Sequence, residues 1–281
     1  MLGGISIFAW DGITTADVRL STGHGGWCQS IDRSVYNLGI LGLSRAMKFI
    51  SLVLFGLVST LASANDAIIP VPRADGWWKE LHERNLRRAE QAGAHQIRVA
   101  FYGDSITQQW EFENQGLPVW KSEMATIPAE NFGIGGDLTQ YLLWRLQNGE
   151  LEGFYPEKVV VLIGTNNLQY NPNPEIIEGI AAVLHEIQLR QPQAQLYVMS
   201  LTPRGDARDP LHLRIAQVNL LLRDRLIASF PSVTYVDFYS RLVTREGLCN
   251  RQFILDDLLH FSTAGYREEA KLLAQYGIKK P

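Results

Sequence analysis

The sequence lacks several features that mark particular classes of protein. It has only two cysteines, Cys28 and Cys249, which are too few for a disulfide framework. Its formal net charge is −3 over 281 residues and it has no long run of Lys or Arg, so the basic surface typical of nucleic-acid-binding proteins is missing. We find no internal repeat and no linker-like segment. The composition therefore predicts an ordinary globular protein that does not bind nucleic acid.

The one marked apolar run lies near the N-terminus. Residues 47–64 read MKFISLVLFGLVSTLASA, in which Lys48 supplies positive charge, an apolar stretch follows, and residues 62–64 form an A-x-A cleavage signal. The run is too short to span a bilayer comfortably, and no cysteine at the cleavage point would carry a lipid anchor. We interpret residues 47–64 as a secretory signal peptide cleaved before Asn65. A buried N-terminal helix is the alternative.

A signal peptide begins near its initiator methionine, and Met47 is well placed for that role. Residues 1–46 are therefore interpreted as a non-native or disordered extension. The mature chain would comprise residues 65–281, with a formal net charge of −4 and Cys249 as a lone thiol of unassigned role. We expect this protein to be exported, either to the periplasm or into the medium, without a stable membrane anchor.

Short apolar segments alternate with helical patterns along the mature chain. The predicted strands are 97–102, 131–134, 158–163, 195–201 and 233–238, and the predicted helices are 138–147, 174–190, 211–230 and 263–276. Such alternation is typical of a parallel sheet covered by helices on both faces. The sequence predicts a single three-layer α/β/α domain, with its functional residues beyond the carboxyl ends of the strands.

Polar residues and glycines follow the first three strands. Ser105 comes directly after the first strand in a Gly-Asp turn, where a helix cap is a common alternative to a nucleophile. Asn166 and Asn167 follow the third strand and would either form a turn or offer a side-chain amide to a developing oxyanion. The second strand leads into GIGGDLT (133–139), where glycine lets the backbone approach a ligand. This segment lacks the G-x-G-x-x-G spacing of a dinucleotide site.

Asp257 and His260 are three residues apart near the C-terminus. A carboxylate at that spacing can hold the imidazole in one tautomer and leave its other nitrogen free to take a proton from a serine. An Asp at a helix start beside an incidental His is the alternative. No second His or Cys stands at ligand spacing here, so we expect no metal. Taken together, these residues supply the nucleophile, base, orienting acid and oxyanion donors of acyl transfer.

The order of these motifs resembles that of the SGNH (GDSL-like) hydrolase family. GDS follows the first strand, glycine the second and GTNN the third, and D-x-x-H stands near the end. The segments NFGIGGDLTQYLLWRLQNGELEG (131–153) and DLLHFS (257–262) further resemble the catalytic subunits of platelet-activating-factor acetylhydrolase and their bacterial relatives. The resemblance covers residues 76–276 and implies a five-stranded, flavodoxin-like parallel sheet.

The resemblance also implies roles for single residues. Ser105 would be the nucleophile and His260 its general base, with Asp257 orienting the imidazole. The oxyanion hole would comprise the backbone N–H groups of Ser105 and Gly136 and the side-chain amide of Asn166. Bulky residues flank the triad in these relatives and crowd the acyl pocket; the matching positions are Ile106, Thr165 and Leu259. Asp104 and Asp137 are expected to support the nucleophile turn from behind.

We therefore expect a serine esterase that hydrolyses short-acyl, above all acetyl, carboxylic esters through an acyl-enzyme, with no cofactor. Carbohydrate and phospholipid O-acetyl esters are both candidate substrates, and export favours the carbohydrate esters. The alternatives are a long-acyl lysophospholipase or thioesterase and a non-catalytic binding module on the same fold. The resemblance leaves a homodimer open. The position of Arg204, in the loop after the fourth strand, is not determined by the sequence.

Overall fold

The computed structural model describes residues 65–124 and 127–278. The extension predicted for residues 1–46 and the signal peptide predicted for residues 47–64 lie outside this part of the chain. Within it, no helix combines the length and the apolar character needed to cross a membrane.

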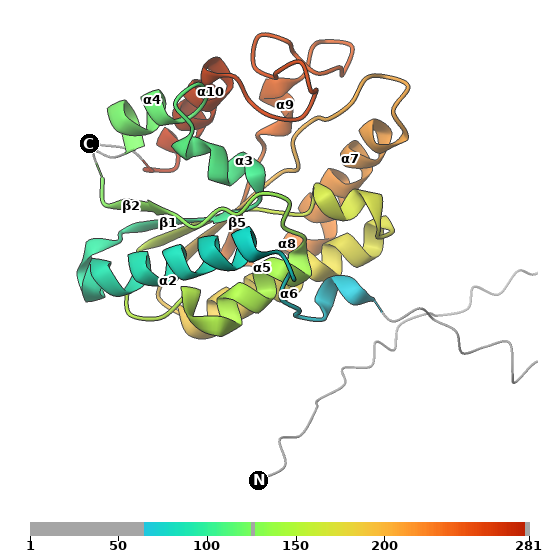
Figure 1. Ribbon diagram of the computed structural model, residues 1–281. Coiled ribbons are helices and arrows are strands. Elements are labelled where there is room, and N and C mark those ends of the chain that lie inside the picture. Colours follow the sequence, from blue (N-terminus) through green and yellow to red (C-terminus); the bar gives the residue numbers. More distant parts are fainter. Residues whose placement is uncertain (1–64, 125–126, 279–281) are drawn as a thin grey trace, which may run out of the picture. The chain divides into compact units, whose positions relative to one another are not determined.

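A five-stranded sheet forms the centre of the domain, and every pair of neighbouring strands is parallel. Its strands are β1 (Val99–Gly103), β2 (Ala129–Asn131), β3 (Lys158–Leu162), β4 (Gln195–Met199) and β5 (Val233–Val236). They lie in the order β2-β1-β3-β4-β5, which is the flavodoxin-like order. The predicted single α/β/α domain with a five-stranded parallel sheet is confirmed (Figure 1).

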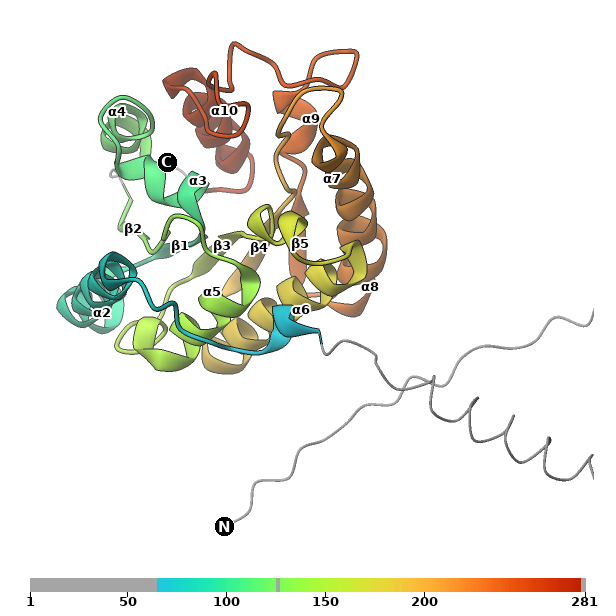
Figure 2. The ribbon, with the colours of Figure 1, turned by 45° about the vertical axis from the view of Figure 1, so that its right-hand side comes forward.

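Helices cover both faces of the sheet (Figures 1 and 2). One face packs against α2, α5, α6 and α7, and the other against α3, α4, α9 and α10. The longer helices are α2 (Gly76–Gln96), α5 (Thr139–Arg145), α6 (Asn173–Arg190), α7 (Pro210–Leu221) and α10 (Thr263–Ala274). The short helical segments are η1 (Asp66–Ile68), α3 (Ser105–Gln108), η2 (Gln109–Glu111), α4 (Leu117–Val119), η3 (Trp120–Met124), η4 (Leu146–Glu150), η5 (Asn166–Gln169), η6 (Leu222–Leu226), α8 (Ile227–Ser229) and α9 (Tyr239–Leu242).

The alternating side chains of each strand divide the core into two apolar clusters. In β1, Ala100 and Tyr102 face the cluster shared with α5 and α6, whereas Val99 and Phe101 face the cluster shared with α10. All five residues of β1 are buried. A strand buried on both faces reads as a continuous apolar run, and this is why the sequence identifies the central strands clearly.

Two elements differ from the sequence prediction. The second strand was expected at 131–134 but spans Ala129–Asn131, because the chain beyond it keeps only single hydrogen bonds to β1, from the N–H groups of Phe132 and Ile134. The long helix α2 was not predicted, since most of its residues are polar and it covers the sheet edge with a narrow apolar stripe.

Glu269 on α10 is a buried carboxyl group outside the catalytic region. Its side chain is 2% exposed and accepts a hydrogen bond from the Trp110 side chain. Burial raises the pKa of Glu269 to about 8. The folded protein therefore keeps a proton on Glu269 up to about pH 8. The unfolded chain releases this proton near pH 4.3, the usual pKa of Glu, at about that pH.

Stability should consequently fall as the pH rises from about 5 to about 8, with a contribution from Glu269 of at most about 1.4 kcal/mol per pH unit. Glu269→Gln should flatten this dependence, because the amide carries no titrating proton. Thermal unfolding measured across this pH range provides the test, with Glu90→Gln on the exposed face of α2 as a matched control. A Glu269→Gln variant with the wild-type slope would contradict the assignment.

Candidate active site

Ser105 is the first residue of α3, directly beyond the carboxyl end of β1. The residue before it, Asp104, caps the helix: its Oδ1 accepts a hydrogen bond of 3.0 Å from the backbone N–H of Ile106. The cap that the sequence allowed at this turn is therefore formed by Asp104. The hydroxyl of Ser105 is left free for another partner.

That partner is His260, whose Nε2 lies 2.8 Å from Oγ of Ser105. The other ring nitrogen, Nδ1, lies 2.6 Å from Oδ2 of Asp257. The second carboxylate oxygen of Asp257 accepts hydrogen bonds of 3.0 Å from the backbone N–H groups of Leu259 and His260. Burial acts to raise the pKa of Asp257, but these hydrogen bonds outweigh it and the pKa is lowered. The carboxylate is thus held ionised beside the imidazole, in the shared turn that the sequence predicts.

The turn between these two residues has an unusual backbone. Leu258 has φ of 56°, in the left-handed region that costs a non-glycine residue on the order of 1 kcal/mol. Backbone hydrogen bonds hold it there, from Leu255 to the His260 carbonyl and from Gly205 to the Leu258 carbonyl, both 2.8 Å. The thiol of Cys249, which is free and buried, donates to the carbonyl of Gly205. Cys249 therefore lies behind this turn.

The glycine-rich loop after β2 lies against the start of α3. A Cβ placed on Gly135 would be 3.6 Å from Cβ of Ser105, and the N–H of Gly135 donates to Oε1 of Gln108 at 2.8 Å. Gly136 has φ of 74°, which a side chain at this position would disfavour. The loop thus places the backbone of Gly135 beside Ser105, one residue before Gly136.

The two asparagines of the GTNN motif have different surroundings. Asn167 is buried, and its Oδ1 accepts a hydrogen bond of 3.0 Å from the N–H of Thr139. Asn166 is partly exposed and donates one amide hydrogen to the carbonyl of Asp137 at 3.0 Å. An amide has two hydrogens, so the second remains available to a ligand. Asn167 fixes the turn, and Asn166 can serve as an oxyanion donor.

A buried arginine that the sequence analysis did not identify lies beneath these loops. The Arg145 side chain is fully buried; its Nε donates to Asp137 at 2.8 Å and it forms a second ion pair with Glu150. Its guanidinium also donates to the carbonyls of Phe132, at 3.0 Å, and of Gly103, at 3.4 Å. One side chain therefore joins the end of β1 to the segment that follows β2. One feature of the sequence could have revealed Arg145: it is the single charged residue within the apolar pattern of the helix predicted at 138–147.

The two supporting carboxyl groups, Asp104 and Asp137, are fully buried, and burial raises their pKa values to about 7 and about 6 respectively. Asp137 accepts hydrogen bonds from Arg145 and, at 2.7 Å, from Nε1 of Trp78 on α2. Among the described residues, Oδ2 of Asp104 has no hydrogen-bond partner. Asp137 therefore connects the loop after β2 to the buried arginine, and Asp104 caps the turn that carries Ser105.

Each of the three residues expected in the acyl pocket is adjacent in sequence to a site residue. Ile106 is buried, and Leu259 packs against the same apolar cluster. Thr165 is 2% exposed, and its carbonyl accepts a hydrogen bond of 3.0 Å from Nη1 of Arg204. Arg204, which the sequence could not place, thus ties the loop after β4 to the turn that carries Asn166.

The arrangement can perform acyl transfer, because a hydroxyl, a base and an ionised carboxylate form one chain of hydrogen bonds beside several N–H donors. Among the described residues, no group of three His, Cys, Asp or Glu side chains is positioned to hold a metal ion.

Comparisons with known proteins place the chain in a family. A model of the GDSL-like Lipase/Acylhydrolase family matches residues 101–268. The chain is 36% identical over 213 residues to platelet-activating factor acetylhydrolase IB subunit alpha1 of Rattus norvegicus, covering 74% of this chain and 88% of that protein. Among solved structures, a protein from Streptococcus pneumonia matches with a TM-score of 0.60 and 20% identity, over 82% of this chain and 98% of that one. A GDSL-like lipase from Bacteroides thetaiotaomicron matches with a TM-score of 0.56 and 20% identity, over 69% and 96%. The chain therefore belongs to the GDSL-like lipase/acylhydrolase family and is a carboxylic ester hydrolase.

Proposed function

We propose that this protein is a serine esterase that removes short acyl groups, above all acetyl, from esters outside the cytoplasm. The observation that carries the mechanism is the chain of hydrogen bonds from Ser105 through His260 to Asp257, with distances of 2.8 Å and 2.6 Å. These distances support general-base activation of Ser105 by His260.

The first half of the reaction forms an acyl-enzyme. His260 takes the proton of Ser105 while Oγ attacks the ester carbonyl carbon. The resulting oxyanion accepts hydrogen bonds from the N–H groups of Ser105 and Gly136 and from the amide of Asn166. The tetrahedral intermediate then collapses: the bond to the alcohol oxygen breaks, and His260 gives its proton to the leaving alcohol.

The second half releases the acid. His260 takes a proton from water, the hydroxide attacks the acyl carbonyl, and the same donors hold the second oxyanion. Breaking the bond to Oγ of Ser105 frees the acid, and the serine regains its proton from His260. The charge of Asp257 stabilises the imidazolium in both halves.

Replacing the nucleophile or an oxyanion donor should affect kcat strongly. Ser105→Ala should abolish hydrolysis of p-nitrophenyl acetate, and Asn166→Ala should lower kcat about 10²–10³-fold, the usual loss for one oxyanion donor. Ser229→Ala on the exposed part of α8 is the matched control and should keep full activity. A serine-reactive phosphonate should label Ser105 in the wild type. Wild-type turnover by Ser105→Ala, or labelling elsewhere, would reject the mechanism.

The preference for a short acyl group is supported by the residues beside the triad. Ile106 and Thr165 are almost fully buried, and Leu259 is held against the apolar cluster next to His260. The relatives at 36% identity are named acetylhydrolases. A long-acyl lysophospholipase or thioesterase would need open apolar space at these positions instead.

In a series of p-nitrophenyl esters, kcat/KM should therefore be highest for acetate and should fall about tenfold or more by octanoate, because extra methylenes overfill a packed site. Leu259→Ala should shift the preference towards longer chains, since it removes bulk next to His260. Leu189→Ala, at an exposed position of α6, should leave the series unchanged. An octanoate preference in the wild type would exclude the small acyl pocket.

Export is proposed from the A-x-A signal at residues 62–64, and the contacts of Asn65 and Ala67 describe the N-terminus that cleavage would leave. Asn65 accepts a hydrogen bond from the N–H of Ala67 and donates one to Glu178 on α6. Ala67 is fully buried. Cleavage before Asn65 would therefore leave a mature N-terminus that is anchored on the domain from its first residue.

N-terminal sequencing of the protein from the extracytoplasmic fraction should yield a chain that begins at or near Asn65. Replacing Ala62 and Ala64 by bulky residues should block cleavage, because small residues are required at these positions of the signal. The uncleaved form should stay with the cells. A secreted chain that begins at Met1 would refute both the cleavage site and the interpretation of residues 1–46.

A further inference from the structure

Three adjoining hollows extend from the oxyanion donors along the surface of the domain. The first, of about 720 Å³, reaches Gly136 and Asn166. The second, of about 550 Å³, shares Gln169 and Tyr170 with the first. The third shares Asn173 and other residues with the second and continues along α7. We call these three hollows, each of which shares lining residues with the next, the side groove.

None of the residues expected in the acyl pocket lines the side groove. Ile106 and Leu259 lie instead in the apolar cluster shared with α10. An ester bound with its carbonyl oxygen at Gly136 and Asn166 would therefore have the side groove free for its alcohol portion.

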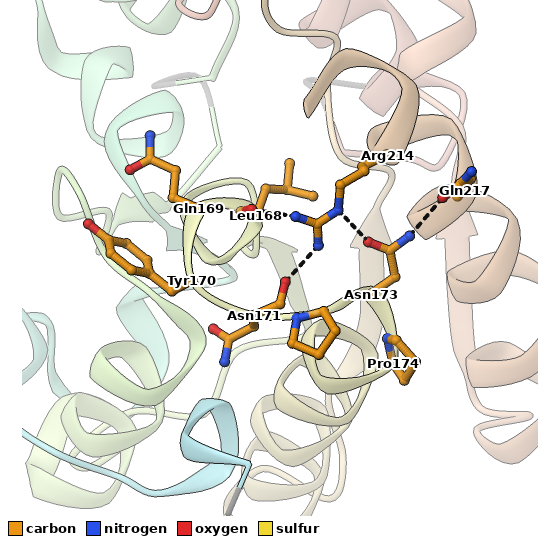
Figure 3. Close-up of a pocket in the computed structure, with 9 residues that line it drawn as sticks. Leu168, Gln169, Tyr170, Asn171, Asn173, Pro174, Arg214 and Gln217 are labelled. Carbon is orange, nitrogen blue, oxygen red and sulfur yellow. Dashed lines mark hydrogen bonds between the residues drawn. The ribbon is translucent and has the colours of Figure 1, made fainter. Parts of the chain in front are cut away.

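The wall of the second hollow is preformed (Figure 3). The guanidinium of Arg214 donates to the carbonyls of Leu168 and Asn171, both at 2.6 Å, and to Oδ1 of Asn173 at 2.8 Å. Asn173 in turn donates to Gln217 at 3.0 Å. These bonds hold the segment after η5 in place without a ligand, so little conformational freedom is lost on binding.

The charged side chains that line the first two hollows are balanced, with Arg73 and Arg214 against Asp66 and Asp75. Arg73 forms an ion pair with Asp75 at 2.9 Å and donates to the carbonyl of Gly135 at 3.1 Å. Arg214 is occupied by carbonyl and amide oxygens, and Asp66 accepts a hydrogen bond from Asn171. This part of the groove therefore favours a neutral ligand over a phosphate group.

The exposed side chains between the first and second hollows are Gln169 and Tyr170. Tyr170 is 69% exposed, although a tyrosine ring is a large and partly apolar surface. Neither its hydroxyl nor the amide of Gln169 bonds to another side chain of the described residues. A flat ring beside free amide and hydroxyl groups suits a sugar, which presents C–H faces and hydroxyl edges. An alkyl chain would need an apolar floor, which the polar first hollow does not offer.

We propose that the side groove binds a carbohydrate chain that carries the scissile ester. The acylated sugar lies beside Gly136 and Asn166, and the next sugar packs on the ring of Tyr170. This assignment rests on the proposed esterase function and extends it, because it names an extended, neutral glycan as the alcohol portion of the substrate.

The proposal is tested with the purified protein on O-acetylated glucose and on an O-acetylated β-glucan tetrasaccharide, with p-nitrophenyl acetate as the reference ester. The tetrasaccharide should have the higher kcat/KM per ester. Tyr170→Ala should lower kcat/KM on the tetrasaccharide about three- to tenfold, mainly through KM, which is the size of a lost aromatic packing contact. Tyr170→Phe should retain the preference, because the ring remains.

Tyr155→Ala is the matched control, since Tyr155 is similarly exposed but precedes β3, at the opposite end of the strands. It should leave both sugar esters unaffected. Equal kcat/KM on the mono- and tetrasaccharide, or an unchanged preference in Tyr170→Ala, would overturn the side-groove proposal. The proposal would also be overturned if the wild type preferred an acetylated glycerophospholipid to the sugar esters and Tyr170→Ala reduced that preference. Failure of the wild type on p-nitrophenyl acetate would instead reject the esterase proposal itself, so the two failures are distinguishable.

Discussion

The buried guanidinium of Arg145 is the interaction on which the geometry of the site depends. Its side chain has no exposed surface, and it is shared between two carboxylates and two backbone carbonyls. A buried charge is tolerated only when its partners are complete, and loss of one partner from such a group is far more costly than loss of an exposed ion pair. Gly103 and Phe132, which supply the carbonyls, precede the nucleophile turn and the oxyanion loop. The positions of both loops are therefore set by one cation.

Through Asp137 this constraint reaches Gly136 and Asn166, the proposed oxyanion donors. The side chain of Asp137 bonds to Arg145, while its backbone carbonyl accepts the amide of Asn166 and its N–H group lies next to Gly136 in the chain. Donors that are fixed before the substrate arrives need no reorganisation when charge develops, and this is the main source of electrostatic stabilisation in such sites. The buried ion pairs of Arg145 thus hold the N–H groups of this loop in fixed positions.

The central features of the fold could be predicted because burial on both faces leaves continuous apolar runs, as in 158–163, and because helices such as α6 carry a strong periodic pattern. The short edge strand β2 was misplaced, since half of its pairing partners are missing at an edge. The pairing of Asp257 with His260 is local, so their spacing suggested it, with a helix-start Asp beside an incidental His as the alternative. The role of Arg145 was not, because its partners come from separate segments that meet only in the folded chain.

Different interactions hold the two halves of the site, which are the loops around Gly136 and Asn166 and the loop that carries Asp257 and His260. The oxyanion half is fixed by buried ions, whereas the Asp257 side chain is 48% exposed and stands on a loop whose Leu258 is held in a left-handed conformation. That turn is held by backbone hydrogen bonds of Leu255 and Gly205 and by the Asp257 carboxylate, which accepts the N–H groups of Leu259 and His260. In the proposed mechanism, the loop that carries Asp257 and His260 would serve proton transfer from Ser105 to the leaving alcohol and from water. The donors that stabilise the developing charge do not have to move with it.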